Sequence, residues 1–305
     1  MIKHPDFWFD DGSVLIIAED EMYRLHRSLI TRLSPSFFDR CCQLASVPEE
    51  CRIDPDLCLL PCFAIRAESN ISKDDLSLLI AYILHDIVLT DDSPFRTVLQ
   101  LYIVSSKEGG DFKKIHDVAD KQLSAIMQKN PLELDFSHHD LLDRAFNISK
   151  ANDNSQLEVL LKRALYYSLA TRDDSGDVGR LEPGLSARDI EGSDPTDIGE
   201  RIMAQLSDHF SPTLFQPPAV LHMQCTDVYA TLWMERAVGP AFDDNGTANP
   251  FMTLRRLRDL DWKRETHELD GERSEPCAEC LEHMRQQWSD EAQAIWGMMD
   301  RWLVE

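Results

Sequence analysis

The residues best suited to chemistry are two cysteines near the end of the chain, Cys277 and Cys280, in the stretch CAEC. Two thiols at this spacing can bind one metal ion from a single helical turn, as in many structural zinc sites. The only comparable pair is in HMQC, with His222 and Cys225. The two pairs supply four soft or borderline ligands, as tetrahedral zinc requires. The sequence therefore supports the hypothesis of a structural zinc ion held by His222, Cys225, Cys277 and Cys280.

Other interpretations of CAEC stay open. A CxxC pair without well-matched partners is often two buried thiols, and His267 and His283 are alternative ligands. The pair could also be redox-active, or part of a thiol-dependent enzyme that uses Cys277 or Cys280 with a histidine. A helix N-terminus lowers a thiol pKa, but we expect Glu279 and the acidic surroundings to oppose that shift.

A second candidate for chemistry is the dipeptide His26-Arg27 in YRLHRSLITRLSPSFFDRC. A catalytic histidine needs a nucleophile or an orienting carboxylate within reach, and no motif here supplies one. We find no GxGxxG, P-loop, HExxH or GxSxG motif in the chain either. We therefore expect His26 to be a buried structural residue at a strand-to-helix junction, and we predict no catalytic residue there.

The elements that position these residues follow from hydrophobic spacing. Apolar runs predict strands at 14–18, 22–25 and 62–65, with an irregular segment at 43–61. Ser34 and Ser93, each before a proline, are expected to cap helices, and Ser72 with Asp75 forms a capping box for a helix at 73–84. Further helices are predicted at 111–127, 138–150, 155–170, from 198, and at 280–303. Prolines from Pro212 onward are expected to interrupt the helix that resumes at 198, and 241–250 reads as a loop.

This order of elements, with the stretch quoted above, resembles the BTB (POZ) fold. The family has a β-hairpin that leads into F-x-x-H-R-x-x-L and then S-x-x-F. Here the hairpin is followed by YRLHRSLI and by SPSFF, so that His26, Arg27, Ser34 and Phe37 carry the fold signature. The resemblance covers residues 7–127 or so and is strongest to fungal BTB proteins. It implies an α+β BTB/POZ fold followed by a mainly α-helical region.

The resemblance also implies functional features. BTB adaptors of cullin-RING ubiquitin ligases carry a hydrophobic-x-Glu motif near the position of Val47, Pro48 and Glu49, which makes this tripeptide a candidate partner interface. Related fungal proteins carry two cysteine pairs in their C-terminal region, which supports the zinc hypothesis. Tyr229 stands where such a pair would place a cysteine.

The composition limits the cellular compartment and the classes of binding partner that we expect. The chain has 305 residues, with 31 Lys+Arg against 54 Asp+Glu and a net charge of −23. This charge repels nucleic acids and anionic membranes, so neither is expected as a partner. No secretory signal or membrane-spanning run is apparent, and eight cysteines in a chain of this length do not form a small disulfide scaffold. We expect reduced thiols and a cytoplasmic or nuclear protein.

We accordingly predict four regions. These are a BTB/POZ domain at 1–130, a helical extension at 131–170, a linker or mobile loop at 171–197, and a mainly helical region with the Cys/His pairs at 198–305. The predicted function is protein–protein interaction without catalysis, through self-association or recruitment of a partner. The alternatives are a substrate adaptor that binds a cullin, and a thiol-dependent enzyme.

Overall fold

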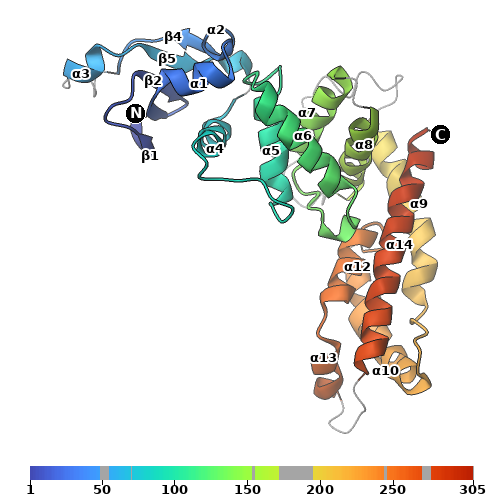
Figure 1. The fold of residues 1–305 in the computed structure, drawn as a ribbon. Coiled ribbons are helices and arrows are strands. Elements are labelled where there is room, and N and C mark those ends of the chain that lie inside the picture. Colours follow the sequence, from blue (N-terminus) through green and yellow to red (C-terminus); the bar gives the residue numbers. More distant parts are fainter. Residues whose placement is uncertain are drawn as a thin grey trace. The chain divides into compact units, whose positions relative to one another are not determined.

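A computed structural model describes residues 1–48, 55–69, 71–152, 155–171, 195–243, 246–269 and 276–304 (Figure 1). The chain forms two compact units. The first unit comprises residues 1–126 and 140–154, and the second comprises 127–139 and 155–305. The predicted extension at 131–170 therefore contributes to both units. Most of the predicted linker, 172–194, lies outside the described residues.

The first unit is built on a five-stranded mixed sheet with the strand order β1-β3-β2-β5-β4. The strands are β1 (Ile2–Trp8), β2 (Val14–Ala18), β3 (Glu21–Leu25), β4 (Cys42–Leu44) and β5 (Cys62–Ile65). Strands β2 and β3 form an antiparallel hairpin, and β5 joins β2 in parallel. The predicted strands at 14–18, 22–25 and 62–65 are confirmed. The prediction that 43–61 is irregular is wrong at both β4 and α3 (Pro55–Cys58).

Besides α3, the described part of the first unit contains six helices. They are α1 (Arg27–Leu33), α2 (Phe37–Cys41), α4 (Lys73–Ile83), α5 (Phe95–Ser105), α6 (Lys113–Met127) and α7 (His139–Ala151), with a short 3-10 turn η2 (Ala67–Ser69). Helices α1 and α2 lie close to the strands, while α5, α6 and α7 form a group beside them (Figure 1). Every residue of β2 is buried, so both faces of the sheet are covered at this central strand. One core cluster lies on one face of the sheet and consists of the buried side chains of Leu15, Ile17, Met22, Leu57 and Cys62.

Of the three predicted helix caps in the first unit, one is confirmed and two are wrong. Ser72 and Asp75 form the predicted capping box at the start of α4, with both reciprocal hydrogen bonds present. Ser34 does not cap α2. Its hydroxyl is buried and donates to the Gly110 carbonyl oxygen over 2.8 Å, so a tertiary contact has taken the place of the cap. Ser93 is likewise not the cap of α5, since its hydroxyl accepts from the backbone N–H of Thr90.

The second unit is helical. It contains a 3-10 turn η3 (Pro131–Glu133), α8 (Ser155–Ala170), α9 (Pro195–Phe215), α10 (Met223–Trp233), a π-helical turn η5 (Met234–Val238), α11 (Gly239–Asp243), α12 (Pro250–Asp259), α13 (Trp262–Leu269) and α14 (Ala278–Val304). Helix α9 continues through Pro212, so the predicted interruption there is wrong. A proline so close to the end of a helix removes only one of the last backbone hydrogen bonds. The prediction that 241–250 is a loop is wrong where α11 extends to Asp243.

The core of the second unit is aromatic around α10 and α14. The rings of Trp233 and Trp262 stack at 6.4 Å, and those of Trp262 and Trp288 at 6.1 Å. All three tryptophans are buried. The architecture is thus α+β, with an N-terminal mixed sheet and helices followed by a mainly helical region. No helix among the described residues has the length and apolarity needed to cross a membrane.

Candidate metal centre

The two predicted ligand pairs lie together in the second unit. The ligand atoms of His222, Cys225, Cys277 and Cys280 are all within 4.8 Å of one another. Nδ1 of His222 is 3.2 Å from Sγ of Cys277 and 3.4 Å from Sγ of Cys280. Bonds of about 2.3 Å to sulfur and 2.0 Å to nitrogen around a tetrahedral zinc ion place the ligand atoms about 3.5–3.8 Å apart. The four side chains therefore need only small rotations to surround a zinc ion.

Each pair is positioned by the first turn of a helix. His222 is the N-cap residue of α10, and Cys225 lies three residues further on. Cys277 directly precedes α14, and Cys280 lies in its first turn. A residue at the N-cap and one three positions later project to the same side of a helix. Two helix N-termini thus meet at one point, with two ligands from each.

The start of a helix also favours thiolates over thiols. The backbone N–H of Cys280 donates to Sγ of Cys277 over 3.4 Å, and that of Cys277 donates to Sγ of Cys225 over 3.5 Å. The Cys280 N–H and the His222 ring lower the pKa of Cys277 to about 7. The opposition expected from Glu279 and the acidic surroundings does not keep this pKa at its ordinary value, and Glu279 itself is exposed.

Burial acts in the opposite direction on the second thiol of CAEC. It raises the pKa of Cys280 to about 11 in the absence of a metal ion. Cys280 and Cys225 are buried, whereas Cys277 is half-buried and His222 is exposed. One edge of the cluster is therefore open to solvent, which gives a metal ion a path of entry.

Of the two alternative ligands, His283 does not join this cluster. Nε2 of His283 lies 3.3 Å from the amide nitrogen of Gln287, one helical turn away on α14. The side chain of His267 lies outside the described part of the structure. Tyr229, which the BTB resemblance places at a cysteine position, is fully buried on α10 one turn after Cys225. It supplies no ligand to the four-residue cluster.

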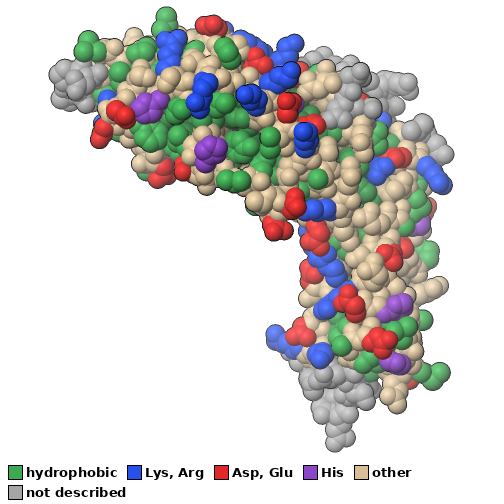
Figure 2. All heavy atoms as spheres, in the orientation of Figure 1, with side chains coloured by type: hydrophobic (Ala, Val, Ile, Leu, Met, Phe, Trp, Pro, Cys, Tyr) green, Lys and Arg blue, Asp and Glu red, His purple; other side chains and the backbone are tan. Residues whose placement is uncertain are grey.

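His26 is half-buried rather than buried, with 32% of its side chain exposed, so this part of the prediction is wrong. Its Nε2 lies 3.3 Å from Oδ1 of Asp11, and its ring stacks on Phe9 at 5.8 Å. It lines a small apolar depression with residues of α1 and α4. Figure 2 shows hydrophobic side chains gathered on the visible face of the first unit. His26 thus combines a contact to the Asp11 carboxylate with ring packing on Phe9, and both tie the end of the hairpin to the segment before β2.

The other fold-signature residues also make structural contacts. The guanidinium of Arg27 lies over the rings of Phe38 and Phe63, at 5.1 and 5.5 Å. Phe37 is buried and packs on Phe38 and on Phe112 of the segment before α6. Together these residues hold α1 and α2 against the rest of the first unit.

The structure describes two of the three residues in the candidate partner interface, which consists of Val47, Pro48 and Glu49. Val47 is partly buried and packs against the core cluster on one face of the sheet. Pro48 is half-buried, and Glu49 lies outside the described residues. An apolar side chain that inserts into a partner has to be exposed first, so the packing of Val47 does not favour this role.

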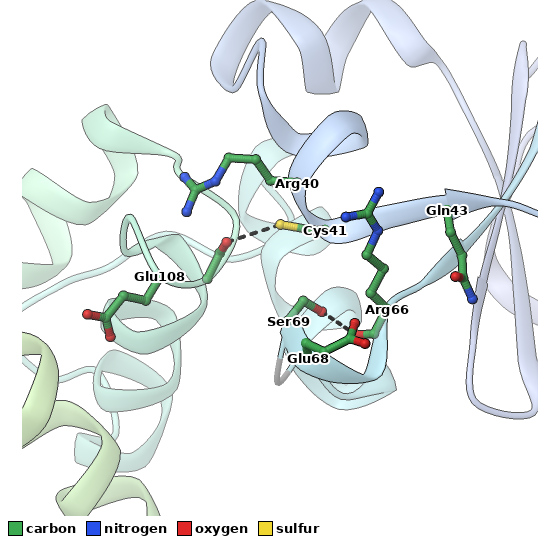
Figure 3. A pocket seen from close by; sticks show the side chains of 8 residues that line it. Arg40, Cys41, Gln43, Arg66, Glu68, Ser69 and Glu108 are labelled. Atoms are coloured by element: carbon green, nitrogen blue, oxygen red, sulfur yellow. Dashed lines mark hydrogen bonds between the residues drawn. The ribbon is translucent and has the colours of Figure 1, made fainter. Parts of the chain in front are cut away.

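An open pocket of about 550 Å³ in the first unit went unrecognised in the sequence. Figure 3 shows Arg66 extending its guanidinium into the pocket beside Cys41, while Arg40 extends toward the loop that carries Glu108. The Cys41 thiol is buried and donates to the Gly109 carbonyl oxygen over 3.1 Å. Burial raises its pKa, so this thiol is a poor nucleophile. The pocket mixes arginines with glutamates and does not select a charge.

Comparison with known proteins does not add a family assignment. No family model matches the chain, and neither a curated protein nor a solved structure matches it. The BTB resemblance stays a prediction from the motif and the order of elements.

Proposed function

We propose that this chain is a non-catalytic protein-binding protein of the BTB type whose helical second unit is held together by a structural zinc ion. The observation that carries the proposal is the convergence of three cysteines and one histidine within 4.8 Å. A structural zinc site has four protein ligands and no open coordination position, and this cluster offers four. Such a site stabilises a fold and performs no chemistry of its own.

The role of the zinc ion follows from where the ligands come from. Cys225 and Cys277 are 52 residues apart in sequence. The ion would fasten the start of α10 to the start of α14, with α11, α12 and α13 in the loop between them. A link across a loop of this length restricts the unfolded chain strongly.

The protein-binding part of the proposal draws on the first unit. Its antiparallel hairpin, the two short helices that follow, and a third strand beside the hairpin agree with the order that the BTB resemblance implies. The described contacts of Arg27 and Phe37 are packing contacts, and those of His26, to a carboxylate and a ring, include no nucleophile, which suits a binding module better than an enzyme.

Metal analysis of the chain purified without chelators tests the zinc site. We expect close to one zinc ion per chain for the natural sequence, and a large loss for Cys280→Ser. Cys58→Ser is the matched control, because Cys58 is an exposed cysteine in the first unit. A natural chain without near-stoichiometric zinc rules the site out.

One observation favours a different class of function. The 3.2 Å contact between His222 Nδ1 and Cys277 Sγ is also the geometry of a cysteine nucleophile with its base. Two further thiols within 4.8 Å of this pair favour metal binding instead. Four ligand atoms this close together suit one tetrahedral metal ion, whereas a nucleophile and its base need no additional thiols. A thiol enzyme would lose activity on alkylation of a metal-free Cys277, whereas the zinc protein would resist alkylation while loaded.

The partner can be sought directly. Affinity capture with the intact chain, combined with its mass in solution, distinguishes self-association from recruitment of another protein. Binding to a cullin N-terminal domain tests the adaptor hypothesis separately. Lack of association at concentrations on the order of tens of micromolar would exclude that hypothesis.

A further inference from the structure

Tyr229 places a polar hydroxyl group in the buried interior of the second unit. It is fully buried, and its hydroxyl has no hydrogen-bond partner among the described residues. A buried hydroxyl without a partner destabilises a fold, and an acceptor beside it would remove that cost. Its ring is fixed edge-on against Trp262 at 5.1 Å, which holds the hydroxyl in one place.

Tyr229 lies on the same side of α10 as one residue of the metal cluster. Tyr229 follows Cys225 by four residues on α10, so the two side chains lie on the same side of the helix. Burial raises the pKa of Tyr229, and negative charge on Cys225, Cys280 and Cys277 raises it further. Arg285 is the cation that acts on the phenol in the opposite direction. The phenol therefore lies within electrostatic range of the three cysteines, although its hydroxyl makes no hydrogen bond to a described sulfur atom in this structure.

Zinc binding would change what those sulfurs can accept. Three thiolates, one Zn²⁺ ion and a neutral imidazole leave one net negative charge, most of it on sulfur. Backbone N–H groups already donate to Cys277 and Cys225. An additional donor from the buried side would stabilise the same charge where water is absent.

We propose that the hydroxyl of Tyr229 donates a hydrogen bond to a thiolate of the metal centre and thereby sets the affinity of the site for its metal. The inference rests on the zinc site proposed above. It makes Tyr229 a positioning residue that acts through a ligand, not a ligand itself. The resemblance led us to expect a cysteine at this position, and a tyrosine fills the role of a donor instead.

Tyr229→Phe removes the hydroxyl and keeps the ring that packs on Trp262. We expect the variant to bind zinc roughly 10-fold more weakly in competition with a chromophoric chelator. With Co²⁺ in place of zinc, the sulfur-to-metal charge-transfer absorption should move to longer wavelength, because a thiolate that loses a hydrogen bond gives up an electron more easily. The metal-free variant should be as stable as the natural chain or more stable, since it no longer buries an unpaired hydroxyl.

Tyr166→Phe is the matched control. Tyr166 is also buried in the second unit, and its hydroxyl also has no partner among the described residues. No cysteine contributes to the rise in its pKa, which burial brings to about 12. This control should leave zinc affinity and the Co²⁺ spectrum unchanged.

The outcomes separate the two claims. Tight metal binding by the natural chain, with affinity and spectrum unchanged in Tyr229→Phe, would overturn the role of Tyr229 and leave the zinc site intact. Equal effects of Tyr229→Phe and Tyr166→Phe would also overturn it, since the loss would then be one of packing. A natural chain that binds neither Zn²⁺ nor Co²⁺ would overturn the site and the inference together.

Discussion

Removal of the proposed zinc ion should lower the free energy of unfolding of the second unit by several kcal/mol. The ion would link Cys225 to Cys277 across 52 residues. Treated as a cross-link, a loop of this length restricts the unfolded chain by about 4 kcal/mol at 25 °C. For a unit of about 160 residues this corresponds to a fall in melting temperature of about 10 °C.

The assay is thermal unfolding followed by near-ultraviolet circular dichroism, which reports on the packed rings of Trp233, Trp262 and Trp288. The natural chain is compared in zinc and in a zinc-specific chelator. Cys277→Ser removes a ligand that is only half-buried, so its packing cost is small. This variant should melt at the lower temperature in both solutions.

Cys58→Ser serves as the control and should keep the full difference between zinc and chelator, because Cys58 lies in the first unit. Identical melting curves for the natural chain in zinc and in chelator would refute the reasoning. A zinc effect that persists in Cys277→Ser would refute the assignment of the ligands.

Two further predictions concern single side chains. In the metal-free chain, the pKa of Cys277 is lowered to about 7, so its thiolate persists to lower pH than that of an ordinary cysteine. Its alkylation rate by iodoacetamide should therefore be half-maximal near pH 7, vanish in Cys277→Ser, and fall sharply when zinc is added; a half-maximum above pH 8 would contradict the geometry. Ser34→Ala should destabilise the first unit by about 1–3 kcal/mol in urea unfolding, because the buried Gly110 carbonyl loses its donor. Ser28→Ala, at an exposed position on α1, is the control, and equal stability of the two variants would contradict this assignment.

Elements with strong local signals could be predicted from the sequence. The capping box of Ser72 and Asp75 begins α4 as expected, because the hydrogen bonds of a capping box involve residues three positions apart. The long apolar stripe of α14 likewise predicted a helix close to its observed bounds, Ala278–Val304. Both features depend on neighbouring residues alone.

Features that depend on distant contacts could not be predicted in this way. Strand β1 is largely exposed, includes Pro5, and is held by parallel pairing with β3. Nothing in its own pattern of hydrophobic residues indicates such a strand. Ser34 has the sequence context of a cap, yet its hydroxyl bonds to Gly110, 76 residues away.

The metal cluster lies between these cases. The spacing of Cys277 and Cys280, and of His222 and Cys225, indicated which residues to consider. Their approach to one another depends on the packing of α10 against α14 around the tryptophan core, which spacing does not reveal. The sequence marked Tyr229 only as a position where the BTB resemblance places a cysteine. Its spacing of four residues from Cys225 also predicts that the two side chains lie on the same side of one helix.

The most direct test of the central claim is X-ray absorption spectroscopy at the zinc edge of the chain purified without chelators. We predict a first shell of three sulfur atoms at about 2.3 Å and one nitrogen at about 2.0 Å. Replacement of His222 by alanine should remove the nitrogen and leave the sulfur contribution. A first shell dominated by oxygen, or one that does not change when His222 is replaced, would contradict the assignment of zinc to His222, Cys225, Cys277 and Cys280.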